Sequence, residues 1–191
     1  RVNTRQNYLI VIALALYAAW FFHAFLGPGL PLFFDAHSHL ARNAFAYQSI
    51  AEGQFPGWTF DWYGGYRFAE FYGPVYYWLN GLIAFLSGKF VFATKLILYV
   101  CLIVSVLGFY SFLRALTISP ALALGAAILY SCMPVFNWVI GTIGNYPSCV
   151  LIAVTPWLCR ATVCYITNNF SQQRYLRFVL INTFFLSVAC S

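Results

Sequence analysis

The residues of this sequence that could do chemistry are concentrated in a polar stretch that follows the first apolar segment and contains Asp35. A carboxylate at this position can act as a general base, or it can hold a divalent cation through its oxygen atoms. The same residue also has the type and the position of an N-cap for a helix that starts at Ala36. The local pattern leaves both interpretations open.

Two histidines and an arginine follow Asp35 closely. His37 and His39 are two residues apart, so on a helix they point to different faces, and they could share a metal ion only in a loop. His39 and Arg42 are three residues apart and could form one cationic face for a phosphate. The alternative for these side chains is polar packing at a membrane interface.

A second group of candidates, farther along the same stretch, mixes carboxylates, an arginine and aromatic rings. Carboxylates can hydrogen-bond to sugar hydroxyls, and aromatic rings offer flat apolar faces to a sugar ring. An ordinary loop at a membrane surface has the same mixture of residues, so both interpretations stand. The substrate-binding candidates in this group are Trp58, Asp61, Tyr63, Arg67, Glu70 and Tyr72.

The chain that carries these residues is mostly apolar. Of its 191 residues, 62% are hydrophobic and 7% are charged, whereas soluble domains have roughly 25% charged residues. So few charges cannot cover a water-soluble surface, and the composition therefore predicts an integral membrane protein. The ten Lys and Arg residues are scattered singly, without a basic run, which argues against nucleic acid as a partner.

Hydropathy predicts an all-α, polytopic transmembrane helical bundle that forms a single membrane domain over residues 1–191. Residues 8–26 have the length and apolarity of a first spanning helix. Residues 30–73 form the polar loop, and residues 74–191 hold further spanning helices, which makes about six apolar segments. Because the chain begins with Arg1 and stops within an apolar run, we expect it to be the N-terminal part of a longer protein.

Within the polar loop, the spacing predicts an amphipathic helix from Ala36 to about Glu52. Such a helix is suited to lie along the membrane interface rather than to cross it. Its apolar face would carry Leu40, Ala44, Tyr47 and Ala51, and its polar face would carry His39, Arg42 and Ser49.

The orientation in the membrane is not settled by the sequence. If every segment crosses and the N-terminus is cytoplasmic, more Lys and Arg residues fall outside than inside, contrary to the positive-inside rule. Either one uncharged segment is re-entrant or the N-terminus is outside. The inside set is Arg1, Arg5, Lys89 and Lys95, and the outside set is Arg42, Arg67, Arg114, Arg160, Arg174 and Arg177.

Five runs of the sequence together resemble GT-C-type membrane glycosyltransferases. They are DAHSHL (35–40), IAEGQFPGW (50–58), WYGGY (62–66), FYGPVY (71–76) and GTIGNYP (141–147). The resemblance is strongest to bacterial and archaeal membrane proteins that are described as related to 6-pyruvoyl-tetrahydropterin synthase. The first four runs are similar to the first extracytoplasmic loop of that group, and the fifth is similar to a turn before a later helix.

This resemblance implies a bundle of many spanning helices in the inner or plasma membrane, with the loop on the extracytoplasmic side. It implies a polyprenyl-phosphate sugar as donor and gives Asp35 the role of base, or of a carboxylate that assists a divalent cation such as Mg²⁺ or Mn²⁺. Arg42 or Arg67 could equally supply the positive charge near the leaving phosphate. The sequence departs from the family at the turn, where Tyr146, Pro147 and Ser148 replace an expected acidic residue.

We therefore predict a GT-C-like glycosyltransferase or a truncated relative, which contacts membrane lipid and a polyprenyl-phosphate sugar. The main alternative is a non-catalytic structural subunit of a larger photosynthetic or respiratory membrane complex, with other membrane subunits as partners. A third interpretation is a module that binds or transports a lipid or a sugar-lipid through the same loop.

Overall fold

The computed structural model describes residues 4–30, 34–54, 57–60, 64–68, 73–134 and 136–167, together with 176 and 180. For residues 4–6, 66 and 137 it describes the backbone alone. In this part of the chain nearly all regular structure is helical, and the described strands are two residues long. The predicted α-helical class is confirmed.

Three of the described helices are long and apolar enough to cross a membrane. The first is α1 (Thr4–Phe21), which continues as the 3₁₀ turn η1 (Phe22–Leu26). The others are α4 (Phe90–Ala115) and α6 (Ser148–Ile166). The predicted first span, residues 8–26, is thus confirmed as a helix, but of the six or so apolar segments expected, the described residues give three spanning helices.

The remaining apolar segments are shorter. Helix α3 (Pro74–Ser87) has 14 residues and α5 (Pro120–Ser131) has 12, so they extend about 21 and 18 Å, less than the roughly 30 Å of a bilayer core. After α5 the chain continues as a π-helix, η2 (Phe136–Ile143). The end of the predicted stretch 74–191, after residue 167, lies outside the residues that the structure describes, except for residues 176 and 180.

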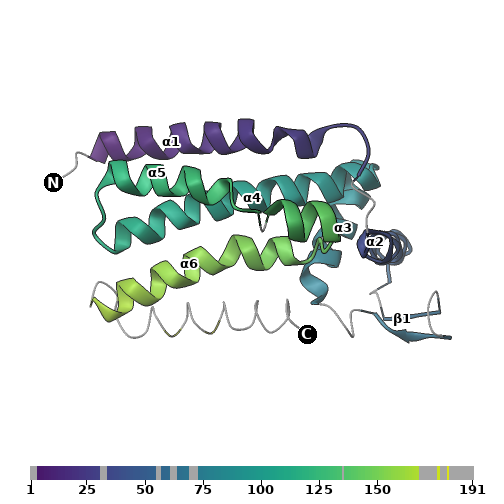
Figure 1. Cartoon of the computed structure of the whole chain (residues 1–191). Coiled ribbons are helices and arrows are strands. Elements are labelled where there is room, and N and C mark those ends of the chain that lie inside the picture. Colours follow the sequence, from purple (N-terminus) through teal and green to yellow (C-terminus); the bar gives the residue numbers. More distant parts are fainter. Residues whose placement is uncertain are drawn as a thin grey trace.

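The long helices lie side by side, and the polar loop gathers at one end of them (Figure 1). We call this end, which carries α2 (Ala36–Ala51), β1 (Trp58–Thr59) and β2 (Tyr66–Arg67), the loop end. The two strands pair antiparallel. Helix α2 is seen end-on in Figure 1 and therefore crosses the bundle axis. This direction is the one that an interfacial helix would have, although the placement of α2 at a membrane surface stays a prediction.

The inward face of α2 is not the face that its pattern predicted. His39, Arg42 and Ser49, expected on the polar outer face, are buried, whereas Leu40 and Ala44 are half-buried. One reason lies in the partner helices α3 and α4, which present the hydroxyl groups of Tyr76, Tyr77 and Thr94 to His39 and Asn43 of α2. Buried polar side chains are stable where such partners are within hydrogen-bonding distance.

Helix α4 is central, because it packs against α1, α3, α5 and α6. Two glycines bring helices together. A Cβ on Gly108 of α4 would lie 2.5 Å from Nε1 of Trp157 on α6, and a Cβ on Gly81 of α3 would lie 3.0 Å from the carbonyl carbon of Ala46 on α2. Small residues at helix contacts are typical of membrane bundles, since they allow backbones to approach closely.

Candidate functional site

Asp35 lies at the residue before α2, at the loop end of the bundle, and its side chain is half-buried. It occupies the N-cap position, but its carboxylate makes no capping hydrogen bond. Its backbone N–H instead donates to the carbonyl oxygen of Ile143, at 3.0 Å, and Ser38 Oγ donates to its carbonyl oxygen at 2.9 Å. The carboxylate is therefore not used to cap the helix.

The contact with Ile143 brings the start of the polar loop to the turn that precedes α6. Gly144, with a φ of +79°, has the left-handed conformation that this turn requires, and a side chain there would be strained. Tyr146 follows in the turn, is fully buried, and has its ring 6.4 Å from the His39 ring. The sequence runs 35–40 and 141–147 thus meet in space.

Tyr146 contributes an uncharged phenol to this region. Burial raises the pKa of Tyr146 to about 12, so the hydroxyl keeps its proton at neutral pH and can act as a hydrogen-bond donor but not as a base. No acidic residue lies between Gly144 and Ser148. Asp35 is consequently the carboxylate that the described residues bring to this turn.

His39 is fully buried on the inward face of α2, where its Nδ1 lies 2.7 Å from the Tyr77 hydroxyl of α3. Burial, and then the nearby positive charge of Arg42, lower the pKa of His39 to about 3. The imidazole is therefore neutral at physiological pH, and it offers a hydrogen bond rather than a charge. Arg42, the other member of the cationic pair expected from the sequence, is also buried.

Deeper in the bundle, two asparagines and a threonine connect three helices. Asn43 Nδ2 of α2 donates to the Tyr76 hydroxyl at 3.2 Å and to Thr94 Oγ1 of α4 at 3.3 Å. Asn80 Nδ2 of α3 donates to the same Thr94 oxygen at 2.9 Å. We call this network, together with the adjoining hydrogen-bonded pair of His39 and Tyr77, the polar seam. Its members are His39, Asn43, Tyr76, Tyr77, Asn80 and Thr94.

Apart from His39, the members of the polar seam were not among the sequence candidates. Asn43, Asn80 and Thr94 are all fully buried, and the Oδ1 atoms of Asn43 and Asn80 have no hydrogen-bond partner among the described residues. A sequence signal exists only for Asn80, an amide side chain within an apolar segment, because such groups in a membrane protein commonly mark a functional or specific contact.

A second feature lies at the other end of α2. A polar pocket of about 270 Å³ opens between the last turns of α2 and the start of β1. Glu52 supplies a carboxylate and Trp58 an exposed indole. The pocket is lined by Phe45, Gln48, Ser49, Glu52, Gln54, Gly57 and Trp58. Of these lining residues, only Trp58 was among the site residues predicted from the sequence.

The polar pocket and Asp35 are separate sites. Asp35 precedes α2 and Glu52 follows it, and at 1.5 Å per residue the helix separates them by about 25 Å. One small substrate cannot contact both side chains. A long substrate, such as a lipid-linked sugar with an acceptor, could contact both.

The other predicted site residues divide into two groups. Arg67 is exposed on β2 and pairs in register with Trp58 on β1, so these two candidates are neighbours. Four further candidates lie outside the residues that the structure describes: Asp61, Tyr63, Glu70 and Tyr72.

A metal site at Asp35 stays a prediction. Among the described residues, no group of three or more His, Cys, Asp or Glu side chains is close enough to hold a metal ion. His37 is exposed and His39 is turned into the polar seam. Asp35 could contribute one carboxylate to a cation that a substrate phosphate also binds.

Comparisons with family models, with curated proteins and with solved structures found no match to this chain. The resemblance to GT-C enzymes therefore stays a prediction from the five sequence runs. Two of these runs meet at Asp35, and a third, residues 50–58, contributes to the polar pocket.

Proposed function

We propose that this chain is a GT-C-like membrane glycosyltransferase, or a truncated relative, that uses a polyprenyl-phosphate sugar as donor. Asp35 is the base that accepts the proton of the acceptor hydroxyl, or the carboxylate that assists a divalent cation such as Mg²⁺ or Mn²⁺. The observation that carries the proposal is the contact between Asp35 and Ile143. This contact places the half-buried Asp35, whose carboxylate does not cap α2, beside the turn at residues 141–147. That turn is one of the runs in which the sequence resembles this family.

The polar pocket provides the second argument. A carboxylate, two side-chain amides and an indole are the groups that bind the hydroxyls and the flat faces of a sugar. In this proposal Glu52, Gln48 and Gln54 hydrogen-bond to a sugar of the acceptor or of the donor, and Trp58 stacks on it. Arg67, which pairs with Trp58 across the hairpin, supplies positive charge near this edge.

The proposal also implies an orientation with the loop end outside the cytoplasm. Helix α3 is too short to cross a bilayer, so α4 leads away from the loop end and ends at the same end of the bundle as the start of α1 (Figure 1). Arg114 of α4 and Asn7 of α1 line the same pocket there. Arg42 and Lys95 of the loop end are buried. These features support a cytoplasmic N-terminus in this proposal.

The test is transfer of labelled sugar from a polyprenyl phosphate in proteoliposomes that contain the full chain. Polyprenyl-phosphate glucose and mannose are the probes, and the readout is label that leaves the lipid fraction in the presence of membrane extract as acceptor source. Asp35→Asn should reduce transfer about 100-fold or more, the usual contribution of a general base. His37→Gln, an exposed site two residues along α2, is the matched control and should keep full transfer.

Two outcomes would contradict the proposal. One is a wild-type chain that neither binds nor turns over either donor, and the other is an Asp35→Asn variant as active as the wild type. The departure at the turn, with Tyr146 where an acid was expected, favours the second candidate function, a non-catalytic structural subunit. Gentle purification that yields the chain in fixed stoichiometry with other membrane subunits would support that alternative.

A further inference from the structure

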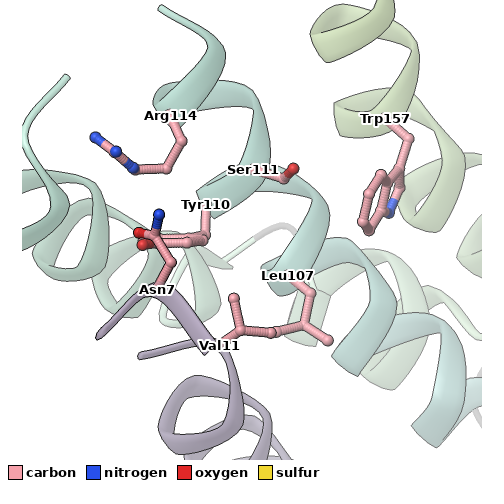
Figure 2. Close-up of a pocket in the computed structure, with 7 residues that line it drawn as sticks. All are labelled: Asn7, Val11, Leu107, Tyr110, Ser111, Arg114 and Trp157. Carbon is pink, nitrogen blue, oxygen red and sulfur yellow. The ribbon is translucent and has the colours of Figure 1, made fainter. Parts of the chain in front are cut away.

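The far end of the bundle contains a pocket that the proposed function does not use. It has a volume of about 310 Å³ and lies between α1, α4 and α6. Figure 2 shows Asn7 of α1 and Tyr110 and Arg114 of α4 gathered on one side of it. We call this the Arg114 pocket.

Two polar groups in the Arg114 pocket lack partners. The Tyr110 hydroxyl and Asn7 Oδ1 are both buried and have no hydrogen-bond partner among the described residues, and Tyr110 is 4% exposed. Leaving such groups unsatisfied is costly. A ligand with hydrogen-bonding capacity in this pocket would satisfy them.

The charge of Arg114 identifies what kind of ligand this is. Its guanidinium has five N–H donors, one of which is used on the carbonyl oxygen of Ile118. All four acidic residues of the chain lie between Asp35 and Glu70, and α4 places Arg114 about 36 Å from its own first residue at the loop end. The described protein therefore supplies no carboxylate here, and a half-buried arginine without one is suited to an external anion.

The remaining lining identifies the rest of the ligand. Val11, Leu107 and the Trp157 ring form the apolar side of the pocket, and Trp157 is fixed by a 3.1 Å hydrogen bond from Nε1 to the Val104 carbonyl oxygen. Asn7 and Arg114 lie at the ends of the candidate spans Asn7–Leu26 and Phe90–Ala115. The polar part is thus at the depth of lipid head groups, and the apolar part is at the depth of acyl chains.

We propose that the Arg114 pocket binds an anionic phospholipid. Its phosphodiester accepts hydrogen bonds from Arg114 and Tyr110, Asn7 accepts from a head-group hydroxyl, and an acyl chain follows Val11 and Leu107. The pocket volume is at the lower end of the roughly 300–1,000 Å³ of ligand sites, which suits a head group and its glycerol rather than a whole lipid. Anionic lipid at the cytoplasmic surface is attracted to cations in this position.

The experiment is native mass spectrometry of the full chain, released from nanodiscs of phosphatidylcholine with phosphatidylglycerol. We expect phosphatidylglycerol to be retained on the wild type, and Arg114→Gln to weaken retention about tenfold or more, since the lost bonds are charge-assisted. Tyr110→Phe, which removes one hydroxyl, should weaken it less. Arg160→Gln is the matched control, because Arg160 is half-buried on α6 but does not line the pocket.

Four results would overturn the proposal. Equal retention by the wild type and Arg114→Gln would show that the arginine does not bind the lipid, and an equal loss with Arg160→Gln would show general attraction to basic charge. Complete competition by soluble glycerol phosphate would make the ligand a soluble phosphate instead. If Arg114→Gln does not fold, Arg114→Lys takes its place, because lysine keeps the charge but lacks the planar fork of arginine. Retention of phosphatidylcholine and phosphatidylglycerol that is unchanged in this variant would also refute the proposal.

Discussion

The contact between α4 and α6 and the contact between α2 and α3 each form around a glycine, Gly108 in the first and Gly81 in the second. Around Gly108 the close neighbour is the Trp157 ring. Around Gly81 the close neighbour is the Ala46 backbone. This approach lies beside the polar seam, where His39 and Asn43 of α2 form hydrogen bonds with Tyr77 and Tyr76 of α3. Close packing is thus common to both contacts, while the hydrogen bonds between side chains of different helices described here accompany the α2–α3 contact.

The difference separates two roles. Van der Waals packing around a small residue holds spanning helices together in lipid without requiring specific partners. A buried polar network requires each partner in place and is destabilised when one is lost. We therefore expect the α4–α6 contact to determine the stability of the bundle, and the α2–α3 contact to determine the arrangement of the loop end.

The strongest test of this comparison is Gly108→Ala. The added Cβ would displace the Trp157 ring and break its hydrogen bond to Val104. Overpacking costs about 1–3 kcal/mol, and the lost bond adds about 1 kcal/mol. Thermal unfolding in detergent should show the loss, and Gly125→Ala, where no atom lies within 4 Å of the new Cβ, should be neutral or stabilising.

Gly81→Ala tests the other contact. The new Cβ would approach the Ala46 carbonyl carbon and oxygen to 3.0 and 3.1 Å, and backbone atoms cannot move away by a rotamer change. Helix α2 should shift from α3, at a cost of about 1–3 kcal/mol. Crosslinking between cysteines introduced on α2 and α3 should report the shift, and an unchanged crosslinking pattern would contradict the assigned role of Gly81.

The polar seam should also respond to pH. His39, whose pKa is lowered from 6.5 to about 3, stays neutral when folded but gains a proton in the unfolded chain below pH 6.5. Stability should therefore fall as pH decreases from 6.5 towards 3, and by pH 5 the loss would be about 2 kcal/mol. Unfolding measured at pH 7 and pH 5 should show this for the wild type, with His37→Gln behaving alike and His39→Gln less sensitive to pH.

Thr94→Val should have the smallest effect of these substitutions on the free energy of unfolding. It removes the hydroxyl oxygen that accepts from both Asn43 and Asn80, and leaves two buried amide donors with fewer partners, at a cost of about 1–2 kcal/mol. Thr155→Val is the control, because the Thr155 hydroxyl is exposed and donates within its own helix to Leu151. Equal unfolding temperatures for the two variants would mean that the seam does not contribute to stability.

The helix boundaries could be predicted from the sequence because proline and glycine mark them. Pro74 and Gly88 delimit α3, and the turn ending at Pro147 precedes α6. The inward face of α2 could not be predicted, because hydropathy assumes that the apolar face is buried. In a bundle whose solvent is lipid, the interior can be the more polar side.

The candidate functional site could be predicted only in part, because some of its residues meet only in the folded structure. Asp35 and Trp58 could be selected from local sequence, and Gln48 and Glu52, four residues apart on one helix face, could have been selected as well. The seam could not, since Asn43, Asn80 and Thr94 belong to three helices and meet only through tertiary packing.

The bond from Asp35 to Ile143 has a consequence for how the protein is made. Residue 35 leaves the ribosome long before residue 143 is synthesised, since domains form from the N-terminus during translation. The polar loop must therefore wait, with α2 only partly held, until η2 and the following turn have been inserted. Biogenesis would complete the loop end last, so that an insertion intermediate carries the loop residues but has not yet assembled the site.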